Sequence, residues 1–162
     1  MGLDLFERND ETLHCRVGSY GSVHEIRSLV ADMVSRPFFY KQFDLKGDEE
    51  VIQILANFAA AQLYSELDFF RRHEEFLNLP KVYQGVIEFV DHSDCDGYHL
   101  PNEVSNITEL FLHVSNDKNI EKFKEETKEE VMHDYKYVIN RLKALYDFFY
   151  EVDQVKGTVL YG

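Results

Sequence analysis

Residues 80–114 read PKVYQGVIEFVDHSDCDGYHLPNEVSNITELFLHV, and this stretch sets the structure of the middle of the chain. Apolar residues recur three and four positions apart on both sides of residues 91–101, which is the spacing of a buried helix face. Pro80 suits the first turn of a helix, where its missing amide hydrogen is not needed. The stretch therefore predicts two helices joined by a loop. The apolar positions are Val82, Tyr83, Val86, Ile87 and Val90 before the loop, and Val104, Ile107, Leu110, Phe111 and Val114 after it.

The loop has the residue spacing of a calcium loop between two helices. Counted from His92, carboxylates stand at the third, fifth and twelfth positions, and a glycine at the sixth allows a sharp turn. The seventh residue would contribute only its backbone carbonyl. The pattern predicts a weak site at 92–103 for Ca²⁺ or another divalent cation. Its metal ligands would be His92, Asp94, Asp96, Tyr98 and Glu103.

Two other interpretations of the loop stay open. His92 replaces the usual first aspartate, and His99 stands at the eighth position, where an aliphatic residue is usual. Asp and Ser side chains at these spacings can hold a turn by bonding to the backbone without any metal. Alternatively, nitrogen and oxygen ligands from His92, Asp94, Asp96 and His99 could hold a transition metal, as in a metal-dependent enzyme.

The rest of the chain predicts an α+β fold that is mostly helical. Alternating apolar residues near the N-terminus and at 155–161 predict short strands, which we expect to pair in a small antiparallel sheet. Helices are predicted from Ser22 to about Ser35, from about Asp48 to about Phe76, and from about Asn119 to about Asp153. With the two helices above, they form a bundle of about five helices in a single domain, 1–162.

The last predicted helix carries a heptad rhythm. Its apolar residues alternate four and three positions apart, which suits either a core-facing stripe or the seam of a homodimer. We therefore expect a monomer or a homodimer formed through the C-terminal helix. The stripe comprises Val131, Tyr135, Val138, Leu142, Leu145, Phe149 and Val152.

Charge restricts the classes of partner. The net charge of −13 disfavours direct nucleic-acid binding and anionic membranes, and it favours a cation or a basic protein partner. The charge is uneven, because the segment between Lys81 and Lys118 holds no lysine or arginine. Its acidic residues are Glu88, Asp91, Asp94, Asp96, Glu103, Glu109 and Asp117.

Catalytic motifs are weak in this sequence. Cys95 lies between two aspartates, which should raise its thiol pKa, and adjacent strand residues such as His14 and Cys15 point to opposite faces. We therefore predict no catalytic residues and a non-enzymatic binding or regulatory protein. The alternatives are the metal-dependent enzyme above and an interference protein of phage type whose acidic surface imitates nucleic acid. The two cysteines are expected to be free thiols in the cytoplasm.

Several short motifs carry a resemblance. The opening Met1-Gly2-Leu3-Asp4, the turn Ser19-Tyr20-Gly21 running into His24-Glu25-Ile26-Arg27, and His92-Ser93-Asp94-Cys95-Asp96-Gly97 resemble a group of small uncharacterised bacterial and phage proteins. The hexapeptide is the most specific of these motifs. The loop itself resembles a degenerate EF-hand. Together these resemblances imply a cytosolic protein and a cation loop, and they imply no activity.

Overall fold

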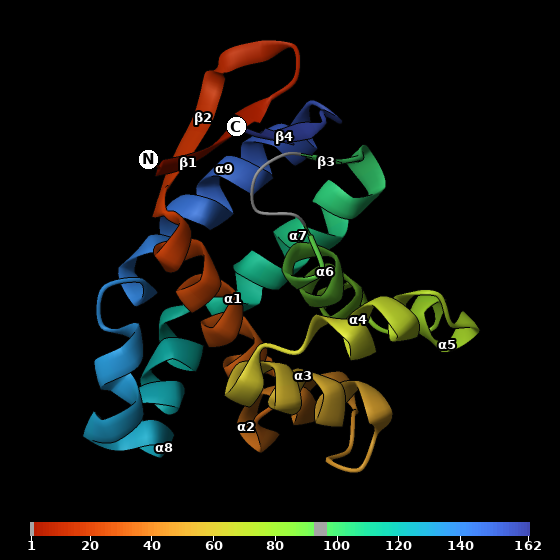
Figure 1. Ribbon diagram of the computed structural model, residues 1–162, viewed down its shortest axis with the longest axis vertical. Helices are drawn as coiled ribbons and strands as arrows, with labels where there is room; N and C mark the ends of the chain where they lie inside the picture. The colour runs from red at the N-terminus through yellow and green to blue at the C-terminus, as the bar shows by residue number, and fades with distance from the viewer. Residues whose placement is uncertain (1, 93–96) are drawn as a thin grey trace.

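A four-stranded antiparallel sheet lies at one end of the molecule, and most of the helices extend away from it (Figure 1). This computed structural model describes residues 2–92 and 97–162. The α+β, mostly helical architecture expected from the sequence is confirmed. Among the described residues, no helix combines the length and the apolar character needed to cross a membrane.

The sheet joins the two ends of the chain. Strands β1 (Gly2–Glu7) and β2 (Asp10–Ser19) form a hairpin, and β4 (Val159–Tyr161) pairs with the other edge of β1. The predicted pairing of N- and C-terminal strands is therefore confirmed. A fourth strand, β3 (Tyr98–His99), pairs with β4 and comes from the loop at 91–101. No sequence pattern predicted this strand, because two residues are too few to show alternation.

Helix α1 (Tyr20–Val34) crosses the centre of the molecule and begins two residues before the predicted start at Ser22. Ser19 caps it, since its hydroxyl oxygen accepts the amide hydrogen of Ser22. The short helices α2 (Pro37–Tyr40) and η1 (Lys41–Phe43) follow. The aromatic side chains of these two helices fill part of the core, because Phe39 and Phe43 pack against Tyr83.

The single helix predicted from about Asp48 to about Phe76 is wrong. The chain instead forms α3 (Glu50–Ala61), α4 (Tyr64–Arg71) and α5 (Glu74–Leu77). Gln62 adopts a left-handed conformation with φ of 52°, which ends α3. The backbone of His73 is extended and separates α4 from α5. These breaks turn α4 and α5 back over α6, where Leu67, Phe70 and Phe76 are buried.

Helices α6 (Lys81–Val90) and α7 (Pro101–Val114) confirm the central prediction. They pack closely at Gly85, where an added Cβ atom would lie 2.2 Å from the carbonyl oxygen of Asn106. All ten apolar positions predicted for the two helices are buried. The pair therefore forms the centre of the core.

The long C-terminal helix predicted from about Asn119 to about Asp153 is also divided. Helix α8 (Asp117–Tyr135) ends, a turn and η2 (Ile139–Arg141) follow, and α9 (Leu142–Gln154) packs on α7 and β2. The heptad residues Tyr135, Val138, Leu142, Leu145, Phe149 and Val152 are buried within the chain, so this part of the stripe faces its own core rather than a homodimer seam. The side chain of Val131 lies outside the described part.

Candidate functional site

The described part of the loop is held by two aromatic residues and a glycine. The ring of His92 stacks on that of Tyr161, with 4.3 Å between the centroids. The His92 Nε2–H donates to the carbonyl oxygen of Tyr98 at 3.2 Å. Gly97 has φ of 121°, and a Cβ atom there would lie 2.7 Å from the His92 ring. The glycine expected at the turn is therefore required by both its conformation and the adjacent ring.

His99 is fully buried at the junction of β3, β4 and α7. Its Nε2 lies 2.8 Å from the Tyr161 hydroxyl, and its Nδ1 lies 3.5 Å from Glu103 Oε1. Burial lowers the pKa of His99 to about 4, against the hydrogen bond with Glu103, which favours the charged form. His99 is therefore a neutral core residue at pH 7, with both ring nitrogens facing protein partners.

Arg71 connects helix α4 to both ends of the loop. Its Nη2 donates to Glu103 Oε2 at 2.8 Å, and its Nη1 donates to the Asp91 carbonyl oxygen at 3.1 Å. Burial alone would raise the pKa of Glu103, but the His99 hydrogen bond and the Arg71 charge hold it below its usual range. Sequence reasoning did not connect Arg71 with the loop, because the two are far apart in the chain.

Three of the five predicted cation ligands, His92, Tyr98 and Glu103, already have protein partners. The Tyr98 carbonyl accepts from His92, and the Glu103 carboxylate accepts from Arg71, so a cation would have to compete with both. Asp94 and Asp96 lie outside the described residues. Within 2–92 and 97–162, no group of three or more His, Cys, Asp or Glu side chains is placed to hold a metal ion. The cation loop at 92–103 and the transition-metal site remain predictions.

The acidic segment between Lys81 and Lys118 is largely compensated in three dimensions. Arg71 pairs with Asp91 and Glu103, and Lys143 Nζ lies 2.7 Å from Asp117 Oδ1. Glu109 faces His113 at 3.9 Å, and Glu88 is buried, where it accepts a hydrogen bond from Asn106. Each described carboxylate of the segment therefore has a partner within the chain, but Glu109 has no full counter-charge, because burial lowers the pKa of His113.

Uncompensated carboxylates gather on another face, formed by α3, α4 and α5. Two pockets of about 310 and 410 Å³ lie there and share Glu50 in their walls. The four glutamates of these walls take part in no ion pair described for 2–92 and 97–162, and no Lys, Arg or His lines either pocket. We call this face the α3–α5 surface; its acidic residues are Glu49, Glu50, Glu66 and Glu75.

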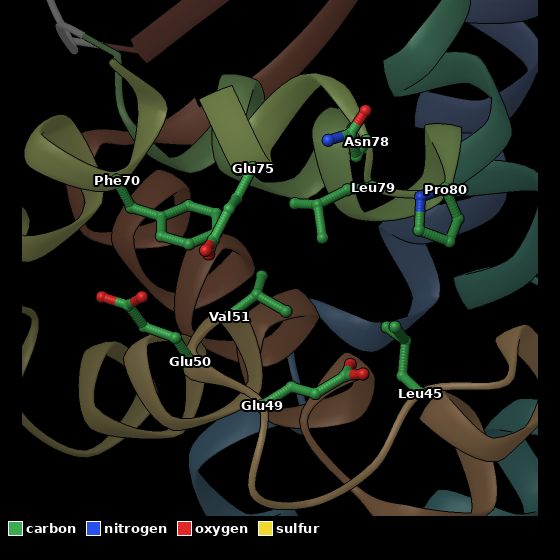
Figure 2. Close-up of a pocket in the computed structure, with 9 residues that line it drawn as sticks. All are labelled: Leu45, Glu49, Glu50, Val51, Phe70, Glu75, Asn78, Leu79 and Pro80. Atoms are coloured by element: carbon green, nitrogen blue, oxygen red, sulfur yellow. The ribbon is translucent and has the colours of Figure 1, made fainter. Parts of the chain in front are cut away.

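The first pocket, the α3–α5 pocket, combines an apolar interior with an acidic rim. Figure 2 shows Val51 and Leu79 pointing toward one another across it. Glu49 and Glu50 come from the start of α3, and Glu75 comes from α5 on the opposite side. The remaining walls are Leu45, Phe70, Asn78 and Pro80. The arrangement suits a group with an apolar stem and a positive end.

The second pocket lies between α3 and α4 and has an exposed aromatic side chain at its edge. Ile54 and Phe69 provide apolar surface, and the Phe69 side chain is 64% exposed. Exposed aromatic side chains are enriched in protein-binding surfaces. Sequence reasoning missed this face, because it placed its four glutamates on one continuous helix. The only signals were the acidic pairs Glu49-Glu50 and Glu74-Glu75.

Comparisons of the chain with protein-family models, with curated proteins and with solved structures found no match. Function is therefore inferred from the chemistry of the loop at 92–103 and of the α3–α5 surface.

Proposed function

We propose that the chain is a non-enzymatic binding protein that recognises a basic segment of another protein through the α3–α5 surface. The observation that carries this proposal is the set of four glutamates, without ion-pair partners among the described residues, around two pockets with apolar interiors. A peptide with lysines and apolar residues would complement both features, since opposite charges across an interface give specificity and fast association. The net charge of −13 would attract such a segment from a distance and repel nucleic acid.

The loop at 92–103 has a supporting role in this proposal. Arg71 and the His99–Tyr161 contact fasten the loop to α4 and to the C-terminal strand. Arg71 is the last residue of α4, so the same contacts hold α4 in place beside α3. This arrangement favours the interpretation of the loop as a structural turn over the metal-dependent enzyme.

The proposal is tested with defined peptides rather than with an unidentified partner. The probe is a fluorescent peptide of Lys-Leu-Ala-Lys repeats, the lysine peptide, and its counterpart with Glu in place of Lys is the acidic peptide. We expect the protein to bind the lysine peptide, to bind the acidic peptide at least about tenfold more weakly, and to lose affinity for the lysine peptide as salt is added. Fluorescence anisotropy at several salt concentrations measures all three results.

A matched pair of variants locates the binding surface. The surface variant changes Glu49, Glu50, Glu66 and Glu75 to Gln, and the control changes the exposed residues Glu11, Glu121, Glu125 and Glu151 to Gln. Both remove four negative charges, so a nonspecific charge effect would weaken both equally. We expect the surface variant to bind about tenfold more weakly and the control to change by less than about twofold. Equal losses in the two variants would contradict the proposal.

A further inference from the structure

The α3–α5 pocket has the size of a single side chain. Its interior is largely apolar, because Leu45, Val51, Phe70, Leu79 and Pro80 line it. The pocket holds about 310 Å³, which accommodates a single long side chain rather than a helix. A side chain with several methylene groups could replace water against these walls.

The acidic rim of the pocket complements a positively charged group. Glu49 and Glu50 come from the start of α3 and Glu75 comes from α5 on the opposite side, so the carboxylates lie on two sides of the pocket (Figure 2). An ammonium group is a compact charge with three donors that can point in different directions. A guanidinium group is planar and matches one carboxylate with two parallel hydrogen bonds. Carboxylates on separate elements therefore suit an ammonium group better.

We infer that the α3–α5 pocket receives a lysine side chain of the bound basic segment, with its stem between Val51 and Leu79 and its ammonium group among Glu49, Glu50 and Glu75. This inference rests on the proposed function and adds a preference for lysine over arginine. The second pocket then contacts neighbouring residues of the same segment.

The experiment compares the lysine peptide with an arginine peptide, which has the same repeats with Arg in place of Lys. We expect the unaltered protein to bind the lysine peptide about fivefold more tightly, although the two peptides have equal charge. Asn78 is an exposed wall residue of the pocket, and Asn78→Phe adds bulk there without changing charge. In this variant we expect the preference for lysine to fall below about twofold. Asn140→Phe, on the exposed side of η2, should retain the full preference.

The outcomes separate this inference from the proposed function. Equal affinities for the lysine and arginine peptides, or a lysine preference that survives in Asn78→Phe, would overturn the pocket inference and leave the basic-segment proposal standing. Binding of the acidic peptide as tightly as the lysine peptide would overturn the proposed function itself. Glu75→Gln provides a second variant that keeps the shape of the pocket, and it too should reduce the lysine preference. Thermal melts of each variant confirm that it is folded.

Discussion

Glu88 is a buried acid that the core tolerates only because it is partly protonated. Its side chain is 4% exposed, and burial raises its pKa to about 7, although the hydrogen bond from Asn106 Nδ2 at 2.8 Å opposes the shift. In the unfolded chain its pKa returns to about 4.5. Between these two values the folded protein retains a proton that the unfolded chain releases, so this residue makes the protein less stable as pH rises from about 4.5 to 7.

Replacing Glu88 by Gln should remove this pH dependence. The Gln carbonyl oxygen can still accept the Asn106 hydrogen bond, so we expect the variant to gain about 2 kcal/mol relative to the unaltered protein between pH 5 and 8. Urea unfolding at a series of pH values measures the difference between the two proteins. His99 also makes stability depend on pH, and its lowered pKa gives a slope of opposite sign. Because His99 is present in both proteins, its contribution cancels when their unfolding free energies are subtracted. A constant difference across this range would show that Glu88 is ionised throughout.

Arg71 and Arg72 are adjacent arginines with different expected contributions. The Arg71 side chain is 30% exposed and bonds Glu103 and the Asp91 backbone, whereas Arg72 is 77% exposed and, in the described part of the chain, pairs with Asp68 alone. Arg71→Met should lower the free energy of unfolding by about 2 kcal/mol, because two partly buried carboxylates lose their cation. Arg72→Met should lower it by less than about 0.5 kcal/mol. Chemical denaturation measures both, and similar losses would contradict the role given to Arg71.

At the scale of elements, the contact between α6 and α7 depends on the absence of a side chain at Gly85. A methyl group there would lie 2.2 Å from the Asn106 carbonyl oxygen, so the helices would have to separate. We expect Gly85→Ala to destabilise the protein by about 2–3 kcal/mol despite the better helix propensity of alanine. Gly21→Ala, in the first turn of α1, meets only Ser19 Oγ at 3.6 Å and should be neutral or slightly stabilising. Thermal or urea unfolding that ranks the two variants in the opposite order would exclude close packing at Gly85.

Predictions of the elements succeeded where a local pattern determined the structure. The two central helices followed from apolar spacing alone, and the terminal strands followed from alternation and from the need to pair their backbone groups. The predictions of long helices failed at breaks without proline or glycine. Gln62 takes a left-handed conformation, and α8 and α9 are separated after Tyr135, although the apolar spacing continues through both positions. Tertiary packing of α4 on α6 and of α9 on α7 outweighs local propensity there.

At the scale of the whole molecule, the stretch of sequence richest in uncompensated acidic residues is not the surface where uncompensated carboxylates gather in the folded protein. The acidic segment between Lys81 and Lys118 folds against cations from distant positions, notably Arg71 and Lys143. The α3–α5 surface, in contrast, brings together carboxylates from three helices that no cation compensates in the described part of the chain. The spacing of carboxylates in the sequence therefore pointed to the loop at 92–103. The α3–α5 surface can be predicted only when the ends of α3 and α4 are known.

The central claim is that the α3–α5 surface is where a basic segment binds. An NMR titration with the lysine peptide, which follows every backbone amide, tests this claim most directly. We expect the changes in chemical shift to concentrate at residues 49–57, 65–70 and 74–80, which line the two pockets. Changes confined to the loop at 97–103 or to α9, with none at α3 to α5, would contradict the claim.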